Sequence, residues 1–105
     1  MKPEQVIAKR LREAREELGL TLEAVGVLAG IDEATAKVRM SQYENARHTP
    51  PISMLFKLAL ALKKPPAWFI VEDELKEPLA IINTLNSTAK SKFIVELQKQ
   101  LEDSK

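Results

Sequence analysis

The sequence of 105 residues contains no cysteine, so it can form neither a disulfide framework nor a thiolate metal site. Its stability must therefore come from packing, which fits a reducing compartment. The sequence also has no apolar run of about 18 residues that could span a bilayer, and residues 1–5 lack the apolar stretch of a signal peptide. We accordingly expect a cytoplasmic protein with no membrane partner.

Signatures of catalysis are missing as well. The chain has no glycine-rich phosphate loop, no nucleophile with a partner base and no cluster of metal ligands. His48 is the only histidine, and alone it cannot form a metal site. We expect no enzymatic activity, no cofactor and no metal.

The charge that is present is divided unevenly along the chain. Formal net charge is only +1, but residues 1–64 carry eleven Lys and Arg against eight Asp and Glu, whereas residues 65–105 carry five against seven. The first part therefore has the positive excess that contact with phosphate would need, and this permits a nucleic-acid partner without requiring one.

The spacing of apolar residues predicts an all-α protein, because helical periodicity recurs along the chain and no strand pattern is found. Thr21, Asp32 and Ser87 are expected to cap helices at their N-termini. We expect the helix at 52–62 to lie at the centre of the core. The predicted helices span residues 4–18, 22–29, 33–44, 52–62, 67–70, 74–85 and 88–102.

Two short helices joined through a glycine-containing turn, the second rich in polar residues, are typical of a helix-turn-helix. Several ordered blocks make the pattern specific: residues 7–15, 19–21, 29–31, 41–45, Pro50, Leu58, Ala59 and Leu62. With these blocks, residues 4–71 resemble the lambda-repressor-like family, also called Cro/CI or XRE-type regulators.

The resemblance implies a five-helix DNA-binding domain, which we place at residues 1–72, followed by a C-terminal helical extension at 73–105. It further implies a transcriptional regulator, a repressor in our interpretation, that binds double-stranded DNA as a homodimer at a palindromic operator. In such a domain the third helix enters the major groove, and the two half-sites lie about 34 Å apart.

Periodicity predicts which side of the third helix faces DNA. At about 100° per residue, the side able to pack carries Ala36, Met40 and Tyr43, and the opposite side is left for bases. The predicted base contacts are Thr35, Val38, Arg39 and Gln42, whose side chains suit guanine, adenine or a thymine methyl group. The predicted phosphate contacts, at the helix end and in the following loop, are Ser41, Asn45, Arg47, His48 and Thr49.

The sequence departs from the family pattern before Ser41. About four additional residues fall within 32–38, and they could lengthen the recognition helix by nearly one turn or lengthen the preceding turn instead. Which of Thr35, Lys37, Val38 and Arg39 would reach the bases depends on this choice. In addition, Leu22 stands where the family often has a DNA-contacting Gln.

Two structural roles are also predicted. The family resemblance suggests an ion pair between Arg10 and Glu44, linking the first helix to the end of the third. Gly26 lies inside a short helix, where it costs up to about 1 kcal/mol relative to alanine, and close approach of the third helix would explain it.

Val27, Leu28 and Leu60 are apolar where the family commonly has polar, exposed residues. We expect residues 73–101 to cover them by packing on the same domain, on its twin or on both. The family itself usually pairs through the region that corresponds to residues 66–71. The main alternative function is an antitoxin or protein-binding adaptor whose C-terminal helices engage a partner protein.

Overall fold

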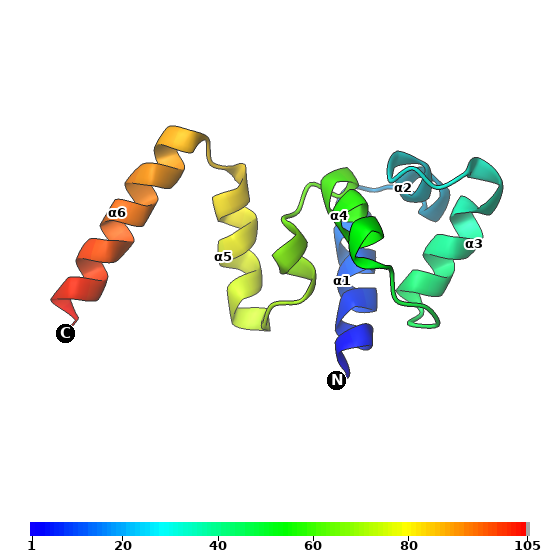
Figure 1. The fold of residues 1–105 in the computed structure, drawn as a ribbon, viewed down its shortest axis with the longest axis horizontal. Coiled ribbons are helices and arrows are strands. Elements are labelled where there is room, and N and C mark those ends of the chain that lie inside the picture. The colour runs from blue at the N-terminus through cyan, green and yellow to red at the C-terminus, as the bar shows by residue number, and fades with distance from the viewer. Residues whose placement is uncertain (105) are drawn as a thin grey trace.

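The computed structural model describes residues 1–104 and is helical throughout. In chain order the elements are α1 (Pro3–Glu17), α2 (Leu22–Leu28), α3 (Glu33–Glu44), α4 (Ile52–Ala61), the 3₁₀-helix η1 (Pro66–Phe69), α5 (Asp73–Thr84) and α6 (Ser87–Asp103) (Figure 1). These bounds agree with the predicted helices to within about a turn, and the all-α class is confirmed. No described helix is long and apolar enough to cross a membrane.

Side-chain caps mark where α2, α3 and α6 begin. Thr21 Oγ1 accepts from the amide of Ala24 at 3.1 Å, and Asp32 Oδ1 accepts from the amide of Ala34 at 3.1 Å, as predicted. The predicted cap of α6 was wrong by one residue. Asn86, not Ser87, precedes that helix, and its side-chain oxygen accepts from the amide of Ala89 at 2.8 Å.

The core lies where α1 to α4 meet η1. It is formed by Leu11, Ala14, Val25, Ala29, Ile31, Ala36, Met40, Tyr43, Leu55, Leu58, Ala59, Leu62, Trp68 and Phe69. The sequence analysis predicted that α4 lies at the centre of this core, but α4 runs along its edge. Ile52 and Phe56 are 73% and 57% exposed, because only one side of α4 faces the other helices.

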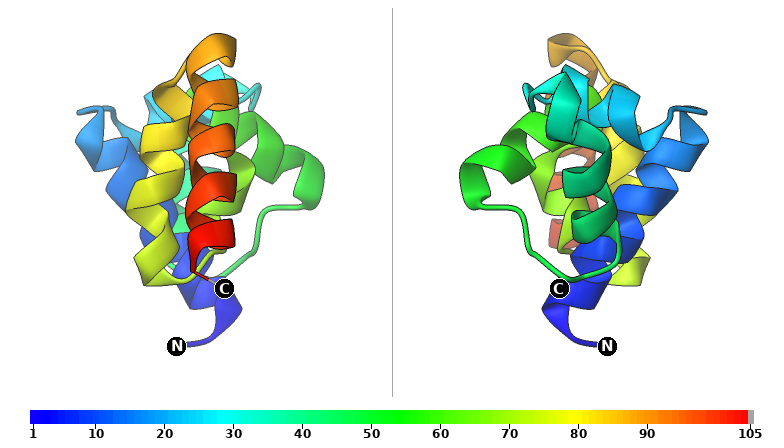
Figure 2. Two further views of the ribbon diagram at one scale, coloured as in Figure 1. Left: turned by 90° about the vertical axis from the view of Figure 1, so that its left-hand side faces the viewer. Right: turned by 90° about the vertical axis from the view of Figure 1, so that its right-hand side faces the viewer.

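α3 and α6 lie at opposite ends of an elongated molecule of 54 × 30 × 23 Å. α6 faces the viewer in the left view of Figure 2, and α3 faces the viewer in the right view. α5 packs on η1, with Leu79 and Ala80 against the core, whereas residues 91–103 of α6 are all exposed. α3 is therefore presented at one end of the molecule and the α5–α6 hairpin at the other.

Close packing of α2 on α3 holds α3 in place. A Cβ atom at Gly26 would lie 2.8 Å from Ala36 Cβ and 3.1 Å from Met40 Cγ, which confirms the predicted close approach at this glycine. Because no larger side chain fits between the two helices, Gly26 sets the distance between them.

We predict that Gly26→Ala lowers the free energy of unfolding by about 1 kcal/mol. Overpacking of this kind costs about 1–3 kcal/mol, and the better helix propensity of alanine returns about 1 kcal/mol. Urea denaturation measures the change. The double variant Gly26→Ala/Ala36→Gly moves the methyl group across the contact and should recover part of the loss. An unchanged or increased stability of the single variant would contradict the close approach.

Candidate nucleic-acid interface

The outward side of α3 carries the residues predicted to contact bases. Thr35, Val38 and Arg39 are exposed and Gln42 is half-buried. The inward side is formed by Ala36, Met40 and Tyr43, which are buried as predicted. At about 100° per residue the four outward residues fall within about 100° of one another, so they form one continuous strip.

The additional residues before Ser41 lengthen α3 itself. The connection from α2 is short, since α2 ends at Leu28 and α3 begins at Glu33, directly after its cap Asp32. The alternative of a longer turn is therefore wrong. α3 gains almost one turn at its N-terminus, and Thr35, Lys37 and Val38 all lie within the helix.

A shallow hollow runs along α3 beside the start of α2. Its walls are formed by Leu22, Lys37, Val38, Ser41, Gln42, Asn45 and Arg47. The hollow brings together two residues of the predicted base set with three of the phosphate set. It also adds Leu22, and Lys37, which the sequence analysis named among the residues that could reach the bases but did not include in the predicted base contacts.

The loop after α3 begins with a left-handed turn. Ala46 has φ +58°, and the amides of Arg47 and His48 both donate to the carbonyl of Gln42, at 3.0 and 3.3 Å. This is the geometry by which helices commonly end. Arg47, His48 and Thr49 are left exposed, close to the end of α3.

Asn45 is less available to a ligand than these three residues. Its side-chain amide donates to the carbonyl of Ser41 at 2.8 Å and lies 3.2 Å from Ser41 Oγ. These contacts satisfy polar groups in the last turn of α3, so Asn45 and Ser41 stabilise the helix end as well as facing the hollow.

The predicted ion pair between Arg10 and Glu44 is wrong. Glu44, whose side chain is 2% exposed, is held by Arg15 through a fork of two bonds: Nε donates to Oε2 at 2.7 Å and Nη2 to Oε1 at 2.9 Å. The hydrogen bond to Glu44 raises the pKa of Arg15 above its ordinary value, and Arg15 also donates to the carbonyl of Leu20 at 3.0 Å. The end of α3 is thus tied to α1, as predicted, but through a different arginine.

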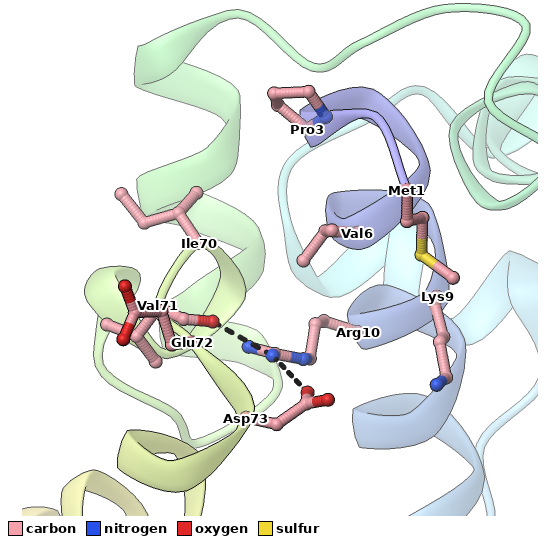
Figure 3. Close-up of a pocket in the computed structure, with 9 residues that line it drawn as sticks. All are labelled: Met1, Pro3, Val6, Lys9, Arg10, Ile70, Val71, Glu72 and Asp73. Atoms are coloured by element: carbon pink, nitrogen blue, oxygen red, sulfur yellow. Dashed lines mark hydrogen bonds and ion pairs between the residues drawn. The ribbon is translucent and has the colours of Figure 1, made fainter.

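Arg10 instead joins α1 to η1 and to the start of α5. Its guanidinium donates to the carbonyls of Trp68 at 2.6 Å and Val71 at 2.9 Å, and to Asp73 Oδ1 at 2.9 Å. Figure 3 shows the last two bonds at the wall of a pocket between α1 and the start of α5. The bond from Arg10 holds the pKa of Asp73 below its ordinary value. Arg10 is only 3% exposed and bonds to three groups that lie about sixty positions away, so it has a structural role.

Positive charge on the side of the loop after α3 favours binding of a polyanion there. No Asp or Glu occurs from Asn45 to Val71, whereas Arg47, Lys57, Lys63 and Lys64 fall in that stretch. Glu44 itself is neutralised by Arg15. The exposed acidic residues of this region, Asp32 and Glu33, are at the N-terminus of α3, where they complement the helix dipole.

The fold is that of a helix-turn-helix protein: α2 is short, Gly26 lets it pack closely on α3, and the outer side of α3 is polar and exposed. The family model described as helix-turn-helix matches residues 11–69. The chain belongs to this family, which confirms the resemblance to XRE-type regulators. The fold is that of a DNA-binding regulator.

A solved structure is similar over almost the whole chain. The crystal structure of transcriptional regulator BswR has 32% sequence identity to this protein and a TM-score of 0.84, with 93% of this chain and 98% of that chain covered. The similarity therefore includes the C-terminal extension as well as the helix-turn-helix. No curated protein matches the sequence.

Proposed function

We propose that this protein is a sequence-specific transcriptional regulator of the cytoplasm that represses genes by binding a palindromic operator as a homodimer. The observation that carries the proposal is a continuous strip on a helix whose other side is buried; Thr35, Val38 and Arg39 of this strip are exposed and Gln42 is half-buried. A helix of this width fits the major groove, and these side chain types match base edges there.

In this proposal different residues make the base contacts and the phosphate contacts. Arg39 is suited to a bidentate bond with guanine and Gln42 to one with adenine, whereas Thr35 and Val38 can pack on a thymine methyl group. Arg47, His48 and Thr49 in the loop, with Ser41 and Asn45 at the helix end, lie where phosphates would pass.

We also propose a division of labour along the chain. Residues 1–72 bind DNA, and residues 73–105, of which 105 lies outside the described residues, bring two copies together. The similarity to transcriptional regulator BswR, which extends over both parts, supports a regulator with this organisation.

Arg39→Ala and Arg47→Ala should separate base contacts from phosphate contacts. Arg39→Ala is expected to cost about 1–3 kcal/mol of binding free energy on the cognate site and to relax discrimination at one base pair. Arg47→Ala should weaken binding to all sequences similarly and reduce the slope of log K against log salt by about 1.

The measurement is selection of a binding site from random oligonucleotides, followed by fluorescence anisotropy at several salt concentrations. Lys2→Ala is the matched control, because it removes an exposed positive charge outside α3, the loop after it and residues 73–105. Equal losses for both arginine variants on cognate and random DNA would refute the division.

A further inference from the structure

α5 and α6 form an open hairpin that leaves most of α6 without a partner. The helices diverge from the short turn at residues 85–86 (Figure 1). In the described part of the chain α6 makes no extensive contact with any other helix. The radius of gyration is 16.0 Å, against about 13 Å for a compact chain of this length. The hairpin therefore protrudes from the rest of the protein.

Both arms of the hairpin carry apolar side chains that the rest of residues 1–104 leaves largely exposed. On α6 they recur at helical spacing and are 38%, 54%, 47% and 64% exposed at Phe93, Ile94, Leu97 and Leu101. On α5, Leu75 and Ile81 are 48% and 55% exposed; Leu75 lies on the flank next to Leu79, which packs against the core, and Ile81 lies about 120° further around the helix. These six residues are called the hairpin surface below.

A helix of this length needs such a surface to be covered. α6 has 17 residues, contains the β-branched Ile94 and Val95, and receives almost no tertiary support. Helices of similar length are only marginally stable in water on their own, and most helical stability comes from packing of an apolar side.

The charges of α6 indicate what covers it. Lys90 and Lys92 lie near its N-terminus and Glu102 and Asp103 near its C-terminus. Each set lies at the end of the helix where the macrodipole disfavours it. A second α6 running antiparallel would bring the cations of each helix beside the anions of the other, whereas a parallel neighbour would bring like charges together.

We propose that the hairpin surface binds the hairpin surface of a second copy of this chain, giving a four-helix bundle in which the two α6 helices run antiparallel about Leu97. A two-fold axis at this residue lets the same patch serve both copies, as a closed dimer requires. The proposal rests on the proposed function and deepens it, since it gives the homodimer contact of residues 73–105 a direction and a two-fold axis.

Two ion pairs join α5 of this bundle to α1 of the helix-turn-helix domain. Asp73 is bonded to Arg10, and Lys76 Nζ lies 2.8 Å from Glu13 Oε2, so α5 is fixed to α1 at two points. Pairing of the hairpins thus sets the relative orientation of the two α3 helices.

Charge reversal tests the pairing in the full-length protein. Lys90→Glu/Lys92→Glu makes α6 acidic at both ends, and Glu102→Lys/Asp103→Lys makes it basic at both ends. By symmetry each double variant replaces four attractive pairs with repulsive ones, so its dimer dissociation constant should rise by about tenfold or more. An equimolar mixture should form a heterodimer of nearly original affinity. Light scattering and sedimentation measure both.

Cysteine cross-linking tests the direction, and the absence of native cysteine makes it clean. Under oxidation Leu97→Cys should form a disulfide between copies. Leu101→Cys should not, because antiparallel helices centred on residue 97 separate the two positions by about 12 Å along their axis, which exceeds disulfide reach. Ser53→Cys, at an exposed position of α4, is the control for random collisions.

A monomeric wild-type protein, a mixture that does not recover, a Leu97→Cys chain that stays unlinked, or efficient linking of Leu101→Cys would each overturn the proposal. All of these measurements are made without DNA. A dimer of this kind together with an Arg39→Ala variant that keeps full specificity would contradict the proposed function alone, and a monomer that reads its operator through Arg39 would contradict the pairing alone.

Discussion

Glu44→Ala is expected to lower the free energy of unfolding by about 3 kcal/mol, a large share of the stability of a domain of this size. The side chain of Glu44 is 2% exposed and that of Arg15 is 16% exposed. Removing the carboxylate leaves a largely buried guanidinium with only the carbonyl of Leu20 as acceptor. Thermal and urea denaturation followed by circular dichroism measure the loss.

Two comparisons make this result specific. Arg12 is half exposed and reaches Glu44 Oε1 only at 3.4 Å, so Arg12→Ala should change stability by no more than about 0.5 kcal/mol. A double-mutant cycle between Arg15 and Glu44 should show strong coupling, whereas a cycle between Arg10 and Glu44 should be nearly additive. Strong coupling between Arg10 and Glu44, with near additivity between Arg15 and Glu44, would instead support the ion pair that the family resemblance suggested.

The sequence nevertheless shows that Arg10 cannot share a carboxylate with Arg12 and Arg15. Positions 10 and 15 are separated by about 140° around a helix, and positions 12 and 15 by about 60°. Arg12 and Arg15 can therefore share one carboxylate, and Arg10 must point elsewhere. Its actual partners are two backbone carbonyls and Asp73, about sixty positions along the chain. A periodicity argument reveals which residues share a side of α1, but not what packs against it.

Helix ends and the two sides of α3 could be predicted, because both depend on local chemistry. Thr21 and Asp32 are short side chains that accept from nearby amides, and the alternation of Ala36, Met40 and Tyr43 with polar residues fixes the buried side. The sequence does not distinguish an extra turn of α3 from a longer loop, because four residues fit either.

It was harder to predict whether the C-terminal extension covers the apolar residues on the surface of the domain. The sequence indicates that Val27, Leu28 and Leu60 are unusual, but it gives no distance between them and the extension. In the structure they are 45%, 62% and 83% exposed, so the expectation that residues 73–101 of the same chain cover them is wrong. α5 leaves the domain on the side of η1, and α6 turns away from it (Figure 1). The exit direction of a chain depends on tertiary contacts such as those of Arg10, which local pattern does not contain.

Trp68→Ala is expected to lower the free energy of unfolding by about 3–5 kcal/mol, the range for truncating a large buried aromatic side chain. Trp68 is 4% exposed and meets Phe69 edge to face, with ring centroids 5.1 Å apart. Lys64 Nζ and Arg10 Cζ lie 5.0 and 5.7 Å from its ring centroid, so the ring also binds cations that join η1 to its neighbours.

The measurement is urea denaturation followed by circular dichroism, because the variant has no tryptophan left to fluoresce. Protein concentration must be held constant, since a dimer makes apparent stability depend on it. Trp68→Phe keeps an aromatic ring in the site and should lose less. Because α5 packs on η1, the alanine variant should also detach the hairpin from the DNA-binding end and weaken operator binding more than binding to a single half-site. A loss below about 1 kcal/mol, or equal weakening on both DNAs, would mean that Trp68 does not connect the two ends of the molecule.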